Sequence, residues 1–513
     1  MKYSLGSLFF VTLLGVAALA QNVSVGYPPS TIQYPNPFKH VVLMIQENRS
    51  PDNLFHELLN YPGLNPANYN LADTGLAYVN GQEQTITLTP TTLALDYDLG
   101  HGHADFVLMY DDGRMDGANQ IPDSCKPNSK DCKDGGKGQN LSYQYVQASD
   151  IEPYLQLAAQ YGFANYFFQS NQGPTFAAHQ YLFSGTSAQD AESDSEGNLV
   201  AGNPQAPRGS NYNPLFDTGC LAPGSEVNWL VTPQSAPNLI ELPNDPLGTL
   251  CFNHDTVATL LDADAISWRY YAPAQNKNPY PDDPNEQGYN VGGYIFNATN
   301  SIYDICQPDA SFQNCTGPEY TANVDLNPTD VLKDIETCNL ATMNWVTPIG
   351  QASDHPGNAH GGEGPSWISA VVNSIGNDTT CENGAGYWSD TAILILWDDW
   401  GGWYDHALPK INSGVWGDNE DGFRVPLLVV SAYTPQAFVS NERHDFGSVI
   451  RFIEGVLGLS EGALNFSDAR ATTDLNEFFN FRMQPRPFQT VHAPLDAHYF
   501  LTDTRIPEPP DFY

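Results

Sequence analysis

Two adjacent carboxylates, Asp398 and Asp399, follow directly after an apolar run that covers residues 392–397. A short unbroken apolar run is typical of a strand that is buried on both faces of a sheet. Open α/β sheets bind ligands beyond the carboxyl ends of their strands, which is where this pair would lie. Asp405 and His406 follow closely, so that oxygen ligands and an imidazole would be available to a divalent metal ion. An isolated Asp-Asp pair more often caps a helix or lies in a turn, but its position after this strand favours chemistry.

A second apolar run ends in the same way. Residues 38–45 are followed by Gln46, Glu47 and Asn48. The carboxyl ends of parallel strands lie at one edge of their sheet, so we expect Glu47 and Asn48 to meet the carboxylates that follow residue 397. The sequence therefore predicts a single divalent metal ion, of unknown identity, where the two strands end.

A hydroxyl group and several histidines complete the set of reactive side chains. Gly173-Pro174 predicts a tight turn that presents Thr175 at the start of a helix over residues 176–184, and a helix N-terminus stabilises anions. His101 and His103 alternate with glycine, and His355 lies in a polar loop. Taken alone, each histidine is more often a structural residue, and Thr175 alone would be an ordinary helix cap.

The elements that must position these residues alternate between strand and helix along the chain. Further strands are expected at residues 265–272 and 424–431, and further helices at 154–161, 365–375 and 448–457. This alternation predicts an α/β fold with a mostly parallel central sheet flanked by helices. Residues 186–252 and 272–330 are rich in Pro, Asn, Asp and Gly and are expected to form long surface loops. We expect residues 37–513 to form a single catalytic domain.

Composition restricts the partners and the compartment. The 513 residues carry 20 Lys and Arg against 59 Asp and Glu, a formal charge of −39, which argues against nucleic acid or an anionic membrane as a standing partner. Residues 1–20 resemble a cleaved signal peptide, and residues 21–36 are an extended lead-in. No later segment is apolar for long enough to cross a membrane, so we expect a secreted or periplasmic protein without stable membrane insertion. The sequence does not indicate an oligomeric state.

Eight cysteines in an oxidising compartment predict four disulfides. Eight cysteines allow 105 pairings. The short spacings favour only two of the bonds, Cys125 to Cys132 and Cys306 to Cys315.

The chain resembles the bacterial phosphoesterase family that contains phospholipases C and secreted acid phosphatases, which have an alkaline-phosphatase-like fold. The resemblance is carried by blocks in family order, namely residues 40–50, 113–117, 173–175 with 184–186, 266–268, 397–406 and 424–431. It implies that Glu47, Asn48, Asp398 and Asp399 hold a metal ion. It also implies that Thr175 faces this metal as the nucleophile and is transiently phosphorylated. His101 or His103, with His355 and His406, would complete the pocket.

The substrate is left open between two classes of phosphate ester. The first interpretation is a phospholipase C type enzyme that cleaves the phosphodiester of a phospholipid head group, and the alternative is an acid phosphatase acting on phosphomonoesters. The third hypothesis is a catalytically inactive secreted glycoprotein. The family usually has Pro-Asn two residues beyond the threonine, where this chain has Ala177-Ala178-His179, so substrate preference does not carry over. We expect His179 to have a structural role.

Overall fold

A computed structural model describes residues 36–126, 129–132, 140–203, 218–221, 228–231, 240–242, 250–273, 275–276, 290–291, 295–312, 314–357, 361–411, 421–505, 507 and 510. Within it, residues 34–513 group into one compact unit. The expected signal peptide and all of the lead-in except Asn36 lie outside the described residues.

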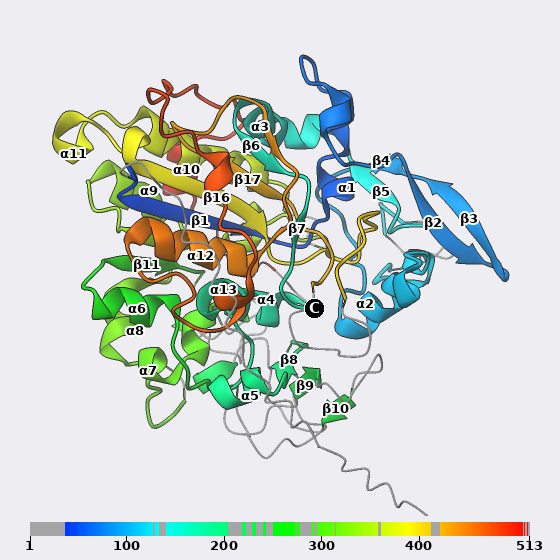
Figure 1. The fold of residues 1–513 in the computed structure, drawn as a ribbon, viewed down its shortest axis with the longest axis horizontal. Coiled ribbons are helices and arrows are strands. Elements are labelled where there is room, and N and C mark those ends of the chain that lie inside the picture. Colours follow the sequence, from blue (N-terminus) through cyan, green and yellow to red (C-terminus); the bar gives the residue numbers. More distant parts are fainter. Residues whose placement is uncertain are drawn as a thin grey trace, which may run out of the picture. The chain divides into compact units, whose positions relative to one another are not determined.

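An eight-stranded sheet forms the centre of the fold (Figure 1). The strands are β1 (His40–Gln46), β6 (Gly162–Ala164), β11 (Trp268–Tyr271), β14 (Val324–Asp325), β15 (Met343–Val346), β16 (Thr391–Trp397), β17 (Leu427–Val430) and β18 (Phe438–Ser440). Their order is β14-β11-β15-β1-β16-β17-β6-β18. Every residue of β1 and β16 is buried, as the unbroken apolar runs predicted for strands covered on both faces.

The sheet is mostly parallel, which confirms the predicted fold class. β1 pairs in parallel with β15 on one side and β16 on the other. The exception is β17, which runs antiparallel to both β16 and β6. Strand direction depends on how the chain returns to the sheet, and the apolar pattern of residues 424–431 carries no signal for it. The strand itself is also shorter than that prediction.

Helices cover both faces of the sheet, and the strand register shows which helix packs on which face. Residues paired in register point to the same face, and successive residues alternate. Trp345 and Leu394 both pair with Leu43, and Trp345 packs on α4 (Thr175–Ser184) with its ring 5.1 Å from that of Phe183. Trp397 lies three residues after Leu394 and therefore on the other face, where its ring is 5.2 Å from that of Tyr154 in α3 (Ala148–Gln160).

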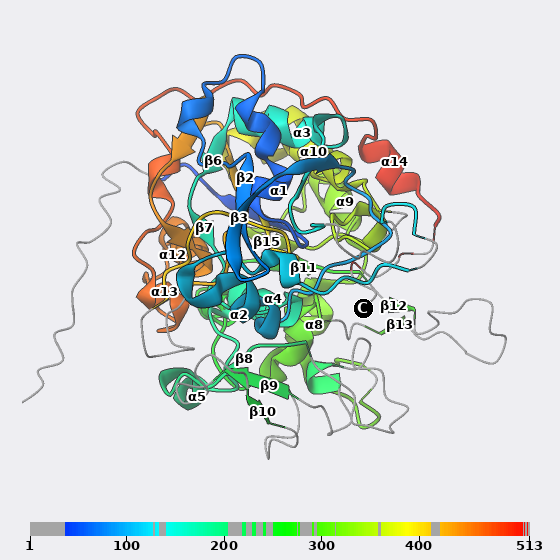
Figure 2. The same ribbon diagram turned by 90° about the vertical axis from the view of Figure 1, so that its right-hand side faces the viewer.

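The remaining helices extend these two layers. α9 (Asp330–Glu336) and α10 (Gly364–Asn377) pack with α3 on one face, while α6 (Val257–Ala263) and α12 (Phe446–Leu457) pack with α4 on the other (Figures 1 and 2). The expected helices are all present, although α3 begins six residues earlier than predicted, at Ala148. In α12, Asp445 accepts a hydrogen bond from Ser448 N at 2.8 Å and so caps the helix.

The described part of the chain also contains a hairpin and four disulfides. β2 (Thr74–Val79) and β3 (Gln82–Thr87) are joined by Asn80-Gly81, both with positive φ, as a two-residue hairpin turn requires. The two predicted bonds, Cys125–Cys132 and Cys306–Cys315, are confirmed, and the predicted total of four is reached by Cys220–Cys251 and Cys338–Cys381.

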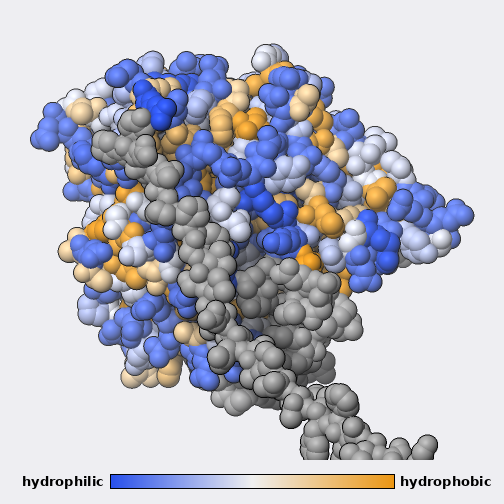
Figure 3. Space-filling view, in the orientation of Figure 1, coloured by the Kyte–Doolittle hydropathy of each residue, from blue (hydrophilic) through white to orange (hydrophobic). Residues whose placement is uncertain are grey.

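The surface carries few large apolar side chains. Among the described residues the exposed ones are Tyr78, Tyr303, Phe312 and Leu408. Figure 3 shows one face of the molecule, where hydrophilic residues predominate and apolar ones form small separate groups. No helix in the described part of the chain is both long enough and apolar enough to cross a membrane.

Candidate active site

The ends of β1 and β16 meet at one edge of the sheet, as the two apolar runs predicted. Gln46 and Trp397, the last residues of these strands, pair in register. Glu47 and Asp398 come next in the chain, so both point to the opposite face from Trp397, toward α4. Both side chains are fully buried. Asp398 N donates to Gln46 O at 2.9 Å, which continues the pairing one residue beyond the strands.

Asn48 lies between the two strand ends and links them. Its backbone N–H donates to Asp398 Oδ1 at 3.0 Å, and its Nδ2 lies 3.1 Å from His101 Nε2. Its φ of 61° is in the left-handed region, which asparagine tolerates better than most residues. A Cβ at Gly401 would lie 2.3 Å from Asn48 O, so only glycine allows the loop after β16 to pass this close.

Thr175 is brought to the same place by α4. It is the first residue of that helix, after Pro174 as N-cap, and its Oγ1 donates to Asp399 Oδ2 at 3.4 Å. Asp399 Oδ1 accepts from Gly401 N at 2.7 Å, which fixes the carboxylate. All ten residues of α4 are buried, so the hydroxyl has a fixed surrounding structure.

His179, which we expect from the sequence to be structural, lies within this cluster. Its Nε2 is 3.3 Å from Glu47 Oε1 and 3.9 Å from Asp398 Oδ2. Glu47, His179 and Asp398 offer ligand atoms that lie within 4.8 Å of one another. The spacing holds a signal that could have found it, because Thr175 and His179 are four residues apart and so share one face of the helix.

The carboxylates and their surroundings fit a divalent cation. Burial raises the pKa of Asp398 well above its usual range, and the charge of Glu47 raises it further. Burial and the charge of Asp398 do the same to the pKa of Asp399. Asn48 Oδ1 and Asp398 Oδ2 are buried without a hydrogen-bond partner among the described residues. Such an arrangement is costly unless a cation binds to it.

The nitrogen donor fits the same ion. Burial lowers the pKa of His179 to about 4, against the opposing charge of Asp398. The imidazole is therefore neutral near pH 7, as a metal ligand must be.

A second group of side chains stands beside the first. Asp98, His101 and His355 offer atoms within 4.8 Å of one another, and the rings of the two histidines are 5.9 Å apart. His101 Nδ1 bonds with Leu99 O at 2.7 Å, and His355 Nδ1 bonds with Pro356 O. These bonds fix both rings and assign the proton to Nδ1 in the neutral form.

His103 lies at the start of α2 (His103–Tyr110), where its Nδ1 bonds with Gln172 O at 2.9 Å in the turn before Thr175. Burial lowers the pKa of His103 and of His355 to about 4.

His406 is held in a separate network. Its Nδ1 bonds with Asp52 Oδ2 at 2.7 Å and its Nε2 lies 3.0 Å from Asn70 Oδ1. Arg424 neutralises this region through bonds to Asp405 at 2.9 and 3.0 Å and to Asp52 at 3.3 Å. The structure therefore does not bring His406 together with the other predicted residues, because the adjacent Asp405 pairs with Arg424, which lies just before β17 (Leu427–Val430).

A cavity of about 600 Å³ reaches Pro174, the residue before Thr175. Its described walls are formed by residues 98–104 with His101 and His103, by residues 122–124, by Pro174 and by residues 201–203. Asn203 Oδ1 accepts from Phe176 N at 3.0 Å and so joins the last of these walls to the first turn of α4. The site therefore has a nucleophile, a carboxylate cluster and histidines next to space for a ligand.

The sequence matches the family described as "Phosphoesterase family" over residues 38–460. The chain belongs to this family. Curated phosphoesterases to which the chain is similar include "Non-hemolytic phospholipase C" of Burkholderia pseudomallei, 25% identical over 86% of this chain and 59% of the relative. "Hemolytic phospholipase C" of Pseudomonas aeruginosa is 22% identical over 93% of this chain and 60% of the relative. The chain thus spans about three fifths of the length of these two relatives.

Solved structures show only a distant similarity to this phosphoesterase. A protein in the alkaline phosphatase superfamily from Vibrio parahaemolyticus is 10% identical, with a TM-score of 0.29 over 79% of this chain and 75% of its own. The crystal structure of Ps i-CgsB gives a TM-score of 0.32 at 10% identity, over 66% of this chain and 71% of its own.

Proposed function

We propose that this chain is a secreted, metal-dependent phosphoesterase that hydrolyses phosphate esters through a phosphothreonine at Thr175, acting on phosphodiesters in the manner of a phospholipase C. The observation that carries the proposal is the place of Thr175, whose hydroxyl lies 3.4 Å from Asp399 at the edge of a buried carboxylate cluster. An ordinary helix cap would not require three buried carboxylates nearby.

The residues divide the chemistry between them. Thr175 Oγ1 passes its proton to Asp399, to which it donates at 3.4 Å, and forms a bond to phosphorus while the bond to the leaving oxygen breaks. The helix N-terminus favours the charge that develops on the hydroxyl oxygen. Glu47, Asn48, Asp398 and Asp399, with His179 added by the structure, are the residues that would hold a divalent ion. Such an ion supplies a Lewis acid that offsets the charge of the phosphoryl oxygens.

The histidines are placed to supply the proton that the leaving alkoxide needs. His101 is held by Leu99 O on one side and reaches Asn48 on the other, so its Nε2 lies next to the carboxylate cluster. In its protonated form His101 donates the Nε2 proton to the leaving alkoxide and becomes neutral, with its remaining proton on Nδ1. Water then passes a proton to His101 Nε2 and attacks phosphorus, the bond from phosphorus to Thr175 Oγ1 breaks, and Oγ1 takes back its proton from Asp399 as the phosphate product leaves. His103 and His355 line the same region and orient the ester.

The cavity favours a diester over a monoester. Asp98 and Asp123 are among its described lining residues, and none of those residues is Lys or Arg. A diester carries one negative charge near neutral pH, whereas a monoester carries close to two, so the carboxylates repel the diester less. The names of the curated relatives support the same choice.

Two substitutions at one position test the proposal. Thr175→Ala should abolish nearly all release of p-nitrophenol from p-nitrophenylphosphorylcholine and from p-nitrophenyl phosphate, because the nucleophile is lost. Thr175→Ser keeps the hydroxyl and should retain a substantial part of the activity, and mass spectrometry of acid-quenched protein should find phosphate on residue 175. Hydrolysis by the alanine variant at close to the parental rate would make water the nucleophile. The ratio of the parent protein's turnover rates on the two substrates decides whether it prefers the phosphodiester or the phosphomonoester.

A further inference from the structure

The wall of the cavity that carries His101 is paired with a second segment. We call residues 96–103 the histidine segment, and residues 121–126 with 129–132 the disulfide loop. Gly100 N donates to Pro122 O at 2.8 Å, and Ser124 N donates to Asp98 O at 2.9 Å. Leu99 and Asp123 form an antiparallel bridge between these two bonds. The disulfide loop is therefore aligned with the histidine segment residue by residue.

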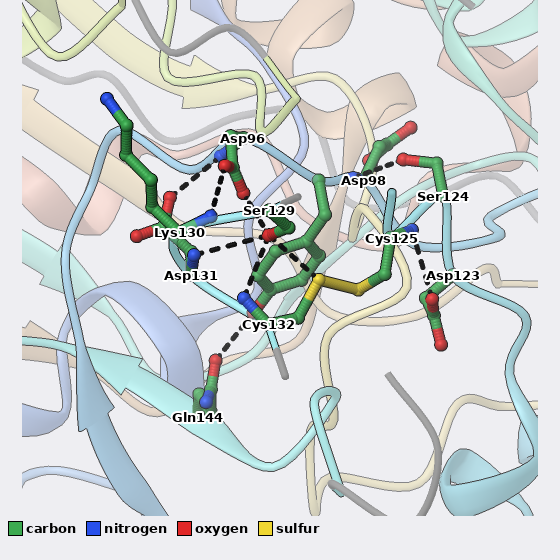
Figure 4. The surroundings of a disulfide bond; sticks show 11 residues. Asp96, Asp98, Asp123, Ser124, Cys125, Ser129, Lys130, Asp131, Cys132 and Gln144 are labelled. Carbon is green, nitrogen blue, oxygen red and sulfur yellow. Dashed lines mark hydrogen bonds between the residues drawn. A yellow bond between two sulfur atoms is a disulfide. The ribbon is translucent and has the colours of Figure 1, made fainter. Parts of the chain in front are cut away.

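Side chains strengthen the pairing at its far end. Asp98 N donates to Ser124 Oγ at 2.8 Å, and Asp96 Oδ2 accepts from Lys130 N at 2.7 Å. The Cys125–Cys132 bond closes the disulfide loop between these contacts (Figure 4). Cys132 is buried in a cluster that also contains Leu99 and Trp400. The disulfide thus holds the loop in the one conformation that supports Asp98 and Leu99.

This support reaches the catalytic region through Leu99. Leu99 O accepts the Nδ1–H of His101 at 2.7 Å, and Leu99 is the residue that bridges to Asp123. Residues of both segments line the cavity of about 600 Å³, which also reaches Pro174, next to Thr175. A cavity of this volume holds a small organic group.

We propose that this cavity is the subsite for the organic group of the phosphate ester, and that the disulfide loop is the wall that selects this group. The proposal rests on the proposed function in that Thr175 marks the position of phosphorus. The lining residues include Gly100, Gly102, Pro122, Pro174 and Ala201, together with Asp98 and Asp123. They fit an uncharged aromatic or alkyl group and repel an anionic one. Opening the disulfide frees the loop from the histidine segment and removes the selection.

The test uses two phosphonates, which bind without being hydrolysed. Phenylphosphonate and methylphosphonate share the phosphorus group and differ only in the organic group, so the ratio of their dissociation constants reports the subsite. By calorimetry the parent protein should bind phenylphosphonate about tenfold or more tightly than methylphosphonate, because only the phenyl group buries apolar area in the cavity. In the Cys125→Ser/Cys132→Ser variant the two dissociation constants should converge to within about threefold, with that of methylphosphonate unchanged.

A matched control is available in the chain. Cys306 and Cys315 close a loop of nearly the same length, with a sequence separation of 9 against 7, in a different cluster of buried residues. Loss of either bond should lower stability by similar amounts, but Cys306→Ser/Cys315→Ser should keep the phenyl preference. If the Cys125→Ser/Cys132→Ser variant binds both phosphonates more weakly by the same factor, Ser124→Ala is the deciding variant. It removes only the acceptor for Asp98 N–H and should still reduce the preference for phenylphosphonate.

Three results would overturn the proposal. One is a Cys125→Ser/Cys132→Ser variant that keeps the full preference for the phenyl group. A second is equal binding of the two phosphonates by the parent, which removes the subsite while leaving the hydrolysis of esters intact. The third is binding of neither phosphonate by a folded parent. Turnover in the p-nitrophenyl assays would then show that only the subsite is lost, and absent turnover would show that the proposed function is lost as well.

Discussion

Gly401 provides a sharp test of how the two strand ends are held together. It has a φ of 60°, and a Cβ at this position would lie 2.3 Å from Asn48 O and 2.7 Å from Asn48 Cβ. A side-chain rotation cannot relieve a contact with a backbone oxygen. In Gly401→Ala, Asn48 must therefore move by about 1 Å to reach an ordinary contact distance, and with it the bonds from Asn48 to Asp398 and toward His101.

The expected cost has two parts. Alanine in the left-handed region costs about 1–2 kcal/mol, and forcing an extra carbon into a packed contact costs about 1–3 kcal/mol. Gly401→Ala should therefore destabilise the protein by about 2–5 kcal/mol, which for a chain of this length lowers the melting temperature by roughly 1 °C per kcal/mol. A displacement of about 1 Å in a catalytic group costs on the order of 100-fold in rate, so activity should fall far more than stability.

Gly458 separates these two contributions. It has a φ of 80° at the end of α12, and a Cβ there would meet nothing within 4 Å. Gly458→Ala should thus lose only the stability that alanine costs in the left-handed region, about 1–2 kcal/mol, and should keep full activity. The two variants are compared by thermal unfolding followed by circular dichroism, by hydrolysis of p-nitrophenylphosphorylcholine and by metal analysis. If Gly401→Ala matched Gly458→Ala in activity and in metal content, the close approach to Asn48 would have no role in the site.

Three further predictions concern the metal and the pH. Asp398→Asn should lose most of the bound divalent metal by elemental analysis while the exposed Asp264→Asn control keeps it, and equal content in both would remove the site. His179→Gln should lower the affinity for zinc more than for magnesium, because imidazole suits zinc, and an unchanged ratio in a competition titration would refute its role as a ligand. Burial and Asp468 raise the pKa of Glu454 to about 8. The folded protein thus holds a proton that the unfolded chain releases near its usual pKa, so the contribution of Glu454 to stability is greatest below about pH 4.5 and is lost toward pH 8 at up to about 1.4 kcal/mol per pH unit. Glu454→Gln should flatten this part of the profile in chemical denaturation.

The sequence predicted the central part of the site because its signals are local. Apolar runs at residues 38–45 and 392–397 mark buried strands, and adjacent parallel strands bring whatever follows them to one edge. Gly-Pro before Thr175 likewise predicts the start of α4. These inferences need no knowledge of distant contacts, and the structure places Glu47, Asn48, Asp398 and Thr175 together as expected.

The parts that sequence reasoning missed depend on distant contacts. The antiparallel direction of β17 follows from the path of the chain between residues 397 and 427, which the apolar pattern does not contain. We predict a structural role for His179, although its spacing from Thr175 places both residues on the same face of α4. The pairing of His406 with Asp52 joins residues 354 positions apart, and no local pattern could have shown it.

Two groups of carboxylates at this edge of the sheet are neutralised in different ways. Asp52 and Asp405 are buried, and Arg424 meets both with bonds of 2.9 to 3.3 Å, so this group already contains its cation. Asp398 and Asp399 are equally buried, yet the ion pairs that the described residues make with Asp398 come only from His179, whose pKa of about 4 leaves it neutral. Among the described residues the charge of Asp398 is thus not met by a fixed cationic side chain, and burial raises the pKa of both Asp398 and Asp399. A divalent ion is the simplest partner that restores the balance at this position, and Thr175 is the hydroxyl that lies beside it.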